Sequence, residues 1–393
     1  MTSYDLNTPL DIDYYDVFGD IPEADRQWWD KARAVAAKIL PETAEAWDKA
    51  EYRLEWAKAL GDAGLLADGV VAAELPQLSP LAAGLVAMEL HRCDGSLGTI
   101  LGVQAGLAMR TIAMYGTEDQ KQRYIGPMSR AEELGSFALT EPDHGSDSVG
   151  LETRMRFDGD EIVIDGEKKW IGNGASGGTT VVFARDEEGN VRGVLVPQDT
   201  PGYRAENIRG KVSLRAIHQA HITLTDVRVP KDNLLPGVKN FKDVSKVLLA
   251  TRVGVAWAAL GHATAVFEAA LTYAKERIQF GKPLVKFQMV QERLTKMLSQ
   301  VVTLQLHCRQ LAELDAQGKL TDTQAALGKY TATRAAREVC AIGRDMLGGN
   351  GILLEHRVVR HFADIEALHT YEGTESIQAL LVGRDITGTG AFV

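Results

Sequence analysis

The sequence has little cysteine and no cysteine cluster. Its 393 residues include three cysteines, Cys93, Cys308 and Cys340, and no two of them form a C-x-x-C pair. Structural zinc sites and disulfide frameworks depend on closely spaced or regularly paired cysteines. We therefore expect no metal site and no disulfide framework. We predict that the three thiols are buried and have no chemical role.

Positive charge is also scarce. The 43 lysines and arginines are outnumbered by 53 aspartates and glutamates, which gives a net charge of −10. This balance disfavours nucleic acid as a partner, because a phosphate backbone binds to a basic surface. Residues 1–20 contain five aspartates and no lysine or arginine, whereas secretory and mitochondrial leaders need positive charge. The sequence therefore predicts a cytoplasmic protein.

Long apolar runs and several common fingerprints are missing. No run reaches the length expected of a membrane span, so we expect no membrane partner. Residues 389–393 do not match a peroxisomal tripeptide. The sequence contains no Walker A motif, no H-E-x-x-H and no G-x-G-x-x-G after a predicted strand. The glycine-rich segment 348–351 follows a predicted helix, so a Rossmann arrangement is not expected.

What is present is an ordinary globular composition, with 45% hydrophobic and 24% charged residues. At roughly 150 residues per domain, the length predicts two to three domains. Residues 1–132 and 239–393 have helical periodicity. Residues 133–238 contain short β-type runs, and the segments 180–184 and 191–196 flank a turn that is typical of a hairpin. The sequence thus predicts a mainly α protein with an inserted β domain.

Two loops in the middle region contain residues suited to ligand binding. In the loop 139–147, Pro142 and Gly145 force an irregular turn, and the hydroxyls and amides around them offer donors to an anion or a polar ring edge. Trp170, ahead of a glycine pair, could stack on a flat ring. Taken singly, these segments fit a plain turn and a buried tryptophan equally well.

Three segments in the last region have the same character. Arg277, at a helix end, is suited to binding a phosphate. The segment 345–351 contains a glycine pair that by default ends a helix. Glu372, before a glycine and after an apolar stretch, could be a buried base, because burial raises the pKa of a carboxylate. Any single one of them is more often an ordinary surface residue.

Together, in this order and at these separations, the five segments resemble the acyl-CoA dehydrogenase and oxidase superfamily over essentially the whole chain. The similarity is greatest to the glutaryl-CoA dehydrogenase branch and to the plant short-chain acyl-CoA oxidase. The resemblance implies an N-terminal helical domain over 1–132, a middle β-barrel-like domain over 133–238 and a C-terminal four-helix bundle over 239–393. It also implies a homotetramer, or dimer of dimers.

The resemblance implies that the cofactor is FAD, held between the β domain and the C-terminal bundle, with the adenosine-pyrophosphate half bound by a partner subunit. The residues that match FAD-binding positions are Phe137, Leu139, Thr140, Gly145, Ser146, Trp170, Ile171, Gly172, Arg277, Phe280, Gln288, Asp345, Met346, Gly348, Gly349, Thr374 and Glu375.

Glu372 matches the catalytic base of the family. It would remove the α-proton of a thioester while flavin N5 accepts the β-hydrogen as hydride, which yields a trans-2-enoyl-CoA. Hydrogen bonds to the thioester carbonyl, one of them from the Glu372 N–H, would stabilise the developing enolate. Because the sequence has no peroxisomal signal, we predict a dehydrogenase that passes its electrons to electron-transferring flavoprotein, with fatty acid β-oxidation as the setting. The residues that match substrate-binding positions are Ser146, Arg252, Gly98, Thr99 and Gly373.

Two departures from the family pattern bear on substrate and acceptor. Gly98 and Gly102 stand where the glutaryl-CoA branch has the arginine and serine that bind the distal carboxylate. A buried carboxylate without its cation is costly, so we predict a short-chain acyl-CoA without a distal carboxylate, while the glycines also leave room. Gly172 replaces the threonine that bonds flavin N5 in most dehydrogenases, as in the plant-type oxidase.

Three alternatives follow from these departures. The first is an acyl-CoA oxidase that uses O2, and the second is a decarboxylating glutaryl-CoA dehydrogenase. The third is an inactive flavin-binding paralogue, although such a protein has no need of a base such as Glu372. A related nitroalkane oxidase would have Asp as its base, whereas Glu372 stands here.

Overall fold

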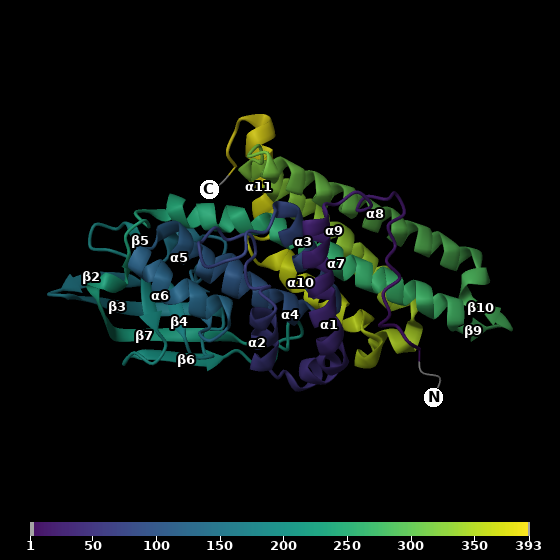
Figure 1. The fold of residues 1–393 in the computed structure, drawn as a ribbon, viewed down its shortest axis with the longest axis horizontal. Coiled ribbons are helices and arrows are strands. Elements are labelled where there is room, and N and C mark those ends of the chain that lie inside the picture. The colour runs from purple at the N-terminus through teal and green to yellow at the C-terminus, as the bar shows by residue number, and fades with distance from the viewer. Residues whose placement is uncertain (1–3, 392–393) are drawn as a thin grey trace.

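The chain folds into a helical, a β and a second helical part, in the order predicted from the sequence. The computed structural model describes residues 4–391. In Figure 1 the β sheet lies at one end of an elongated molecule, the N-terminal helices lie in the middle, and the long C-terminal helices extend to the other end. The predicted fold class, mainly α with an inserted β domain, is therefore confirmed.

Local sequence signals start two of the N-terminal helices. Ser79 caps α3 by accepting the N–H of Ala82 at 2.9 Å, and Asp94 caps α4 by accepting the N–H of Ser96 at 2.8 Å. Helix α4 continues directly into an eight-residue π-helix, η1, a feature that is frequent at functional sites. The helices are α1 (Glu23–Lys49), α2 (Leu54–Asp62), α3 (Pro80–Cys93), α4 (Gly95–Leu101), η1 (Gly102–Met109), α5 (Arg110–Tyr115) and α6 (Glu118–Ser129).

The middle part is an eight-stranded mixed sheet with its own apolar core. The strand order is β6-β7-β3-β2-β4-β5-β8, and β1 pairs with β4 in parallel. Alternate residues such as Ile162, Ile164, Val194 and Val196 face this core. The strands are β1 (Gly135–Ala138), β2 (Arg154–Asp158), β3 (Glu161–Gly172), β4 (Thr179–Arg185), β5 (Val191–Pro197), β6 (Tyr203–Asn207), β7 (Gln219–Pro230) and β8 (Leu234–Leu235). The short helices η2 (Ser148–Gly150) and η3 (Lys231–Asn233) connect them.

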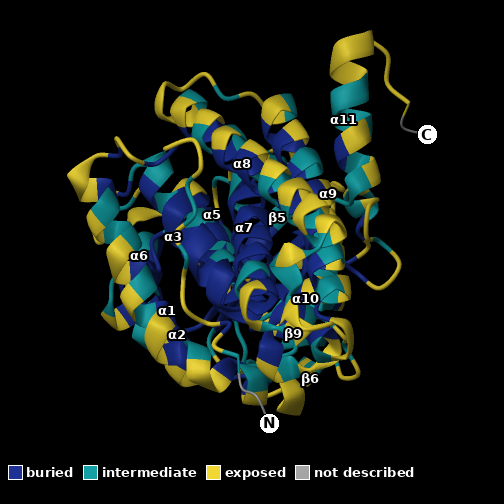
Figure 2. Ribbon diagram, turned by 90° about the vertical axis from the view of Figure 1, so that its right-hand side faces the viewer, coloured by how far each residue is buried: buried dark blue, intermediate teal, exposed yellow. Residues whose placement is uncertain are grey.

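Helix α7 is the centre of the C-terminal part. Figure 2 shows it as a buried helix among α3, α8, α9 and α10, and α7 packs on each of them. Helix α11 packs on α9 at the edge. The elements are α7 (Phe241–Glu276), β9 (Ile278–Gln279), β10 (Lys282–Pro283), η4 (Leu284–Lys286), α8 (Gln288–Ala316), α9 (Asp322–Met346), η5 (Gly348–Ile352), η6 (Leu354–His356), α10 (Val358–Thr370) and α11 (Glu375–Thr387).

Two helical stretches are longer and more apolar than expected from the sequence. Gly95–Tyr115 and Phe241–Glu276 both reach the length and composition of a membrane span, contrary to the expectation that no run does so. Their most apolar windows are 72% and 50% buried inside the protein. Core helices of this kind are apolar because they pack against protein on several sides.

The three cysteines are free and buried, as predicted. The Cys93 thiol donates to the carbonyl of Ala36 at 3.4 Å. Burial, together with the nearby Asp94 carboxylate, raises the pKa of Cys93 to about 12. A protonated, enclosed thiol is a poor nucleophile, so Cys93 is a packing residue.

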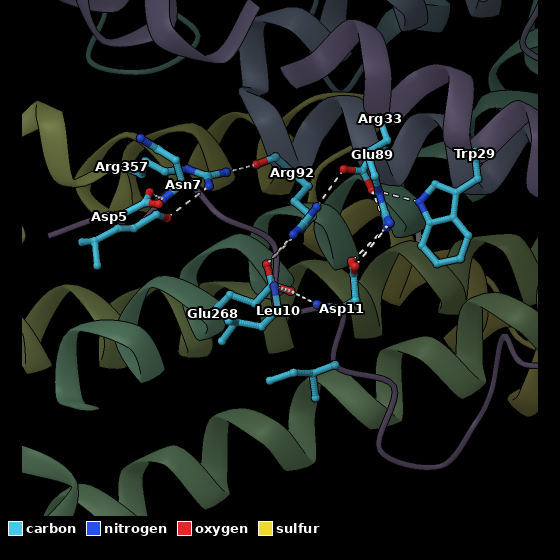
Figure 3. Close-up of polar contacts among 12 residues, drawn as sticks. Asp5, Asn7, Leu10, Asp11, Trp29, Arg33, Glu89, Arg92, Glu268 and Arg357 are labelled. Atoms are coloured by element: carbon cyan, nitrogen blue, oxygen red, sulfur yellow. Dashed lines mark hydrogen bonds and ion pairs between the residues drawn. The ribbon is translucent and has the colours of Figure 1, made fainter. Parts of the chain in front are cut away.

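A hydrogen-bond network connects the segment before α1 to helices α3 and α7 (Figure 3). The N–H groups of Leu10 and Asp11 both donate to Glu268 Oε1 at 3.1 Å, and Arg92 Nη2 donates to Glu268 Oε2 at 2.7 Å. Arg92 also pairs with Glu89 at 2.7 Å. One buried guanidinium thus pairs with two buried carboxylates, and Arg33 adds a second positive charge 3.6 Å from Glu89. The network fixes the N-terminal segment to the C-terminal helices.

Candidate active site

Glu372 lies in a short loop with a left-handed backbone between α10 and α11. Its φ is +56°, which is uncommon for a residue with a side chain, and Gly373 follows at φ +84°. A Cβ on Gly373 would lie 2.6 Å from Gln378 Nε2, so glycine is needed there. Thr374 then caps α11 by accepting the N–H of Ile377 at 3.4 Å. Strained backbone of this kind is often found at functional sites.

The Glu372 carboxylate is held by α7. Thr251 Oγ1, from the middle of the buried helix, donates to Glu372 Oε2 at 2.9 Å. Burial raises the pKa of Glu372, although the Thr251 hydrogen bond and the charges of Lys329 and Arg252 act in the opposite direction. The N–H of Glu372 has no acceptor among residues 4–391. The loop therefore presents a carboxylate with increased basicity and a free backbone donor.

Two cations lie near this carboxylate. Lys329, on α9, is fully buried and donates to the carbonyls of Tyr371 and Gly373. Arg252, next to Thr251, is partly buried, and its Nε has no partner among the described residues. Burial lowers the pKa of Arg252. An unpartnered buried guanidinium atom is suited to an anionic or carbonyl ligand.

The π-helix η1 packs on α7 near Thr251, and the end of α4 lies near Tyr371. Thr99, on α4, is hydrogen-bonded to its own helix through Gly95 O at 2.8 Å and lies near the buried Tyr371 hydroxyl. A Cβ on Gly106 would come within 3.6 Å of Thr251 Cγ2, and one on Gly102 would meet nothing within 4 Å. The predicted substrate position Thr99 is therefore brought to the Glu372 loop, and Gly102 lies beside open space.

Gly98 does not leave room, contrary to the expectation from the sequence. A Cβ there would lie 2.2 Å from the ring of His91, so the imidazole fills the space where a side chain would stand. His91 is buried and shares a nitrogen–nitrogen contact of 3.4 Å with His262. Burial lowers the pKa of His91 to about 3, so this imidazole is neutral and provides no positive charge at the position of Gly98.

The loop 139–147 is organised by a buried ion pair. Lys168 Nζ donates to Glu141 Oε1 at 2.8 Å and to the Leu139 carbonyl at 3.1 Å. Burial lowers the pKa of Lys168 to about 8. Burial alone would raise the pKa of Glu141, but the charge of Lys168 and the hydrogen bonds to the carboxylate bring that pKa below its usual value. Thr140 accepts the N–H of Lys169 at 2.9 Å through its carbonyl. Gly145 and Ser146, in the second half of this loop, are exposed.

The predicted flavin positions after the loop differ in exposure. Trp170 has φ +68° and is 55% exposed, whereas the Ile171 side chain packs in the core of the β domain. Phe137 is buried against Phe183, with ring centroids 4.8 Å apart. A Cβ on Gly172 would lie 2.6 Å from Val103 Cγ2 of η1. Gly172 is thus needed for the close approach of the β domain to the π-helix, a constraint that the sequence did not reveal.

A second group of predicted residues lies at the far end of the bundle. The C-cap residue Arg277 follows α7, and Phe280, at the tip of the β9–β10 hairpin, is 93% exposed (Figure 1). Gln288 begins α8, and Asp345 pairs with Arg293 at 2.9 Å. Along α7, residue 277 lies 26 positions after residue 251, or about 39 Å at 1.5 Å per residue. Within one chain this group is therefore far from Glu372.

The exposed positions fit a flavin dinucleotide. A Cβ on Gly145, Gly348 or Gly349 would meet nothing within 4 Å, so a ligand can approach these backbones closely. The exposed Trp170 indole can stack on a flat ring, and the Arg277 guanidinium can bind a pyrophosphate. Other predicted positions have structural partners: Glu375 pairs with Arg334 and His369, and Met346 is the last residue of α9.

The geometry agrees with what known proteins show. Three consecutive family models, described as the N-terminal, middle and C-terminal domains of acyl-CoA dehydrogenase, match residues 22–132, 136–227 and 241–387. The mitochondrial short-chain specific acyl-CoA dehydrogenase of Bos taurus is 35% identical over 373 residues, which cover 92% of this chain and 90% of that protein. The matches define an oxidoreductase built from three domains. The chain belongs to the acyl-CoA dehydrogenase family.

Two solved structures support the same conclusion. A glutaryl-CoA dehydrogenase from Mycobacterium smegmatis superposes with a TM-score of 0.93 at 36% identity, over 95% of this chain and 97% of that one. A glutaryl-CoA dehydrogenase from the same organism, in complex with FADH2, superposes with a TM-score of 0.92 at 32% identity, with the same coverage. The resemblance inferred from the sequence motifs is confirmed.

Sequence reasoning missed the residues that support the site from a distance. Thr251 and Lys329 contact the Glu372 loop from α7 and α9, across 121 and more than 40 residues of chain. Val103 and His91 fill the spaces beside Gly172 and Gly98. Helix α9 is amphipathic and contains several charged residues, so no pattern singled out Lys329 or its partners.

Proposed function

We propose that this acyl-CoA dehydrogenase oxidises a short-chain, monocarboxylic acyl-CoA to its trans-2-enoyl-CoA, with Glu372 as the base. The observation that carries the proposal is the Glu372 loop, with its carboxylate held at 2.9 Å by Thr251 and an N–H without an acceptor among the described residues. The cofactor is FAD, which when bound accepts the β-hydrogen as hydride. The residues proposed to hold FAD are the exposed loop around Gly145, the side chain of Trp170, and Arg277 at the C-terminal end of α7.

The chain's own residues account for the proton transfer. Burial favours the protonated form of Glu372, so the carboxylate binds a proton from the substrate α-carbon more readily than it would in water. The free N–H of Glu372 is available to the thioester oxygen, where negative charge develops as the α-proton leaves. Arg252 offers its unpartnered Nε to a polar group of the same ligand.

The surroundings of Gly98 support a monocarboxylic substrate, because they contain no positive charge. A distal carboxylate near this position would be buried without a cation, because Gly98 has no side chain and His91 beside it is neutral. The buried His91 ring also closes the space behind Gly98, which favours a short acyl chain. Glutaryl-CoA is therefore disfavoured as a substrate.

We propose electron-transferring flavoprotein as the acceptor, within fatty acid β-oxidation. The space beside Gly172 is filled by Val103 Cγ2, only 2.6 Å from an added Cβ, so the missing threonine side chain leaves no open channel there. We also propose a homotetramer, as the family resemblance implies. It is supported by the position of Arg277, which lies about 39 Å along α7 from Thr251 and is therefore better placed to serve the Glu372 loop of another subunit.

An anaerobic titration of the purified yellow protein with butyryl-CoA tests the proposal. Bleaching of the flavin absorbance is expected, and Glu372→Gln should abolish it while FAD remains bound. Admission of air then distinguishes an oxidase, which regains its colour rapidly, from a dehydrogenase, which needs the flavoprotein acceptor. Bleaching by glutaryl-CoA but not by butyryl-CoA would refute the assignment of the substrate. A protein that binds FAD and bleaches with no acyl-CoA would be an inactive paralogue.

A further inference from the structure

Lys329 is a buried cation that the proposed chemistry does not use. It belongs to α9, its side chain is fully buried, and its hydrogen bonds within residues 4–391 go to backbone carbonyls and not to a carboxylate. A buried ammonium group is costly unless hydrogen bonds compensate for the lost water. Both hydrogen bonds of Lys329 go to the Glu372 loop, to the carbonyl before that residue and to the carbonyl after it.

These two hydrogen bonds fix the conformation of Glu372. The carbonyls of Tyr371 and Gly373 belong to peptide planes on either side of it, and Gln378 Nε2 donates to the carbonyls of Glu372 and Gly373 at 3.0 Å. A left-handed backbone costs about 1–2 kcal/mol for a residue with a side chain. The surrounding donors must therefore hold the loop. Within the part of the chain that the structure describes, Lys329 is the only donor to the backbone carbonyls of Tyr371, Glu372 and Gly373 from outside the loop and α11.

We propose that Lys329 is a positioning residue of the dehydrogenation, which holds Glu372 in its left-handed conformation so that the carboxylate stays beside Thr251 and the N–H stays free for the thioester oxygen. This inference rests on the proposed function, in which Glu372 is the base. A loss of the Lys329 hydrogen bonds would allow the loop to relax, and a displacement of about 1 Å at a reacting group can cost about 100-fold in rate.

The charge of Lys329 also acts on Glu372. The groups that face the lysine are the Glu372 carboxylate in the loop, Arg252 on α7 and His369 on α10. Burial lowers the pKa of Lys329 to about 7, while Glu372 raises it and Arg252 lowers it further. The Lys329 charge in turn lowers the pKa of Glu372. Removal of the lysine should therefore move the acid limb of the pH–rate profile to higher pH.

The test compares three variants of the full-length holoenzyme. Lys329→Met keeps the length of the side chain but cannot donate, and Lys329→Gln keeps a donor without charge. Lys38→Met is the matched control, because Lys38 is exposed on α1 and its side chain forms no hydrogen bond or ion pair with residues 4–391. The measurements are the anaerobic rate of flavin reduction by butyryl-CoA from pH 5 to pH 9, the butyryl-CoA dependence of that rate, and amide hydrogen exchange of residues 371–378.

We expect Lys329→Met to reduce flavin about 100-fold more slowly at saturating butyryl-CoA, with the acid limb at higher pH and faster exchange of residues 371–378. Lys329→Gln should recover much of the rate, and Lys38→Met should match the wild type. A wild-type rate and exchange in Lys329→Met would overturn the proposal, and so would equal losses in the Met and Gln variants. If the Met variant does not fold, the Gln variant decides: a rate loss of about 100-fold with unchanged loop exchange would overturn the proposal, because the rate would then not depend on the conformation of the loop. Failure of the wild type to reduce its flavin with any acyl-CoA would instead refute the proposed function. The two failures can be told apart, because hydrogen exchange of the loop is measured without substrate.

Discussion

Thr251 donates the one side-chain hydrogen bond that the Glu372 carboxylate receives within residues 4–391, at 2.9 Å. Replacement of Thr251 by valine removes the hydroxyl and keeps the branched shape. The hydrogen bond lowers the pKa of Glu372, so its loss should raise that pKa further. Because the base must be ionised to accept the α-proton, the acid limb of the pH–rate profile for flavin reduction should move to higher pH.

The size of this change follows from the contacts of the hydroxyl. A hydrogen bond to a charged group is worth about 1.5–3 kcal/mol, and 1.36 kcal/mol corresponds to one pKa unit. Thr251 Oγ1 also lies 3.0 Å from the Leu248 carbonyl. It can therefore donate a hydrogen bond to Leu248 while its oxygen accepts one from the O–H of neutral Glu372, so both forms of the carboxyl keep a hydrogen bond. The lower end applies, and we expect a displacement of about one pH unit.

The assay is anaerobic stopped-flow reduction of the flavin by butyryl-CoA between pH 5 and pH 9. Thr264→Val is the matched control, because Thr264 lies on the same helix, is buried, and its hydroxyl has no partner among the described residues. It should leave the profile unchanged. An acid limb of Thr251→Val that stays in place, or moves to lower pH, would show that this hydroxyl does not stabilise the carboxylate.

Three further predictions concern the surroundings of the site. Lys168→Met leaves Glu141 buried without its cationic partner, which costs about 3–5 kcal/mol of stability. We expect weaker FAD binding, measured by titration of the apoprotein with FAD. An unchanged FAD affinity would contradict the role of the ion pair in organising the loop. Burial, and then the charge of Asp94, raise the pKa of Asp364 to about 7. Between about pH 4 and 7 this group is ionised in the unfolded state but still protonated in the folded state, so the free energy of unfolding falls as pH rises. Asp364→Asn should therefore raise Tm at pH 8 and not at pH 4, and equal effects at both pH values would refute this. Gly172→Thr should lower stability by about 1–3 kcal/mol through contact with Val103, and Val103→Ala in the same chain should restore Tm; no recovery would place the clash elsewhere.

The sequence predicted the domain order because periodicity is local. The short β-type runs 180–184 and 191–196, on either side of a turn, identified strands, and long apolar-periodic stretches identified the C-terminal helices. The sequence also pointed to Glu372, because residues 370–374 form one of the motifs that carry the family resemblance. The buried cysteines were predictable for a similar reason, because isolated thiols without a metal-ligand spacing usually pack in a core.

Other features depended on contacts between distant segments. The glycine at position 98 reads as empty space in the sequence, but α3 places the His91 ring there. In the same way, the π-helix places Val103 against Gly172, and both α7 and α9 reach the Glu372 loop.

The sequence by itself determined which chemical groups this protein has and the order in which its domains follow one another. Only the tertiary structure decided which of these groups meet. Thr251 and Glu372 are 121 residues apart in the chain and 2.9 Å apart in space, and the basicity of the carboxylate depends on that contact and on burial. Burial and hydrogen bonding are properties of packed neighbours, so no local pattern of residues contains them.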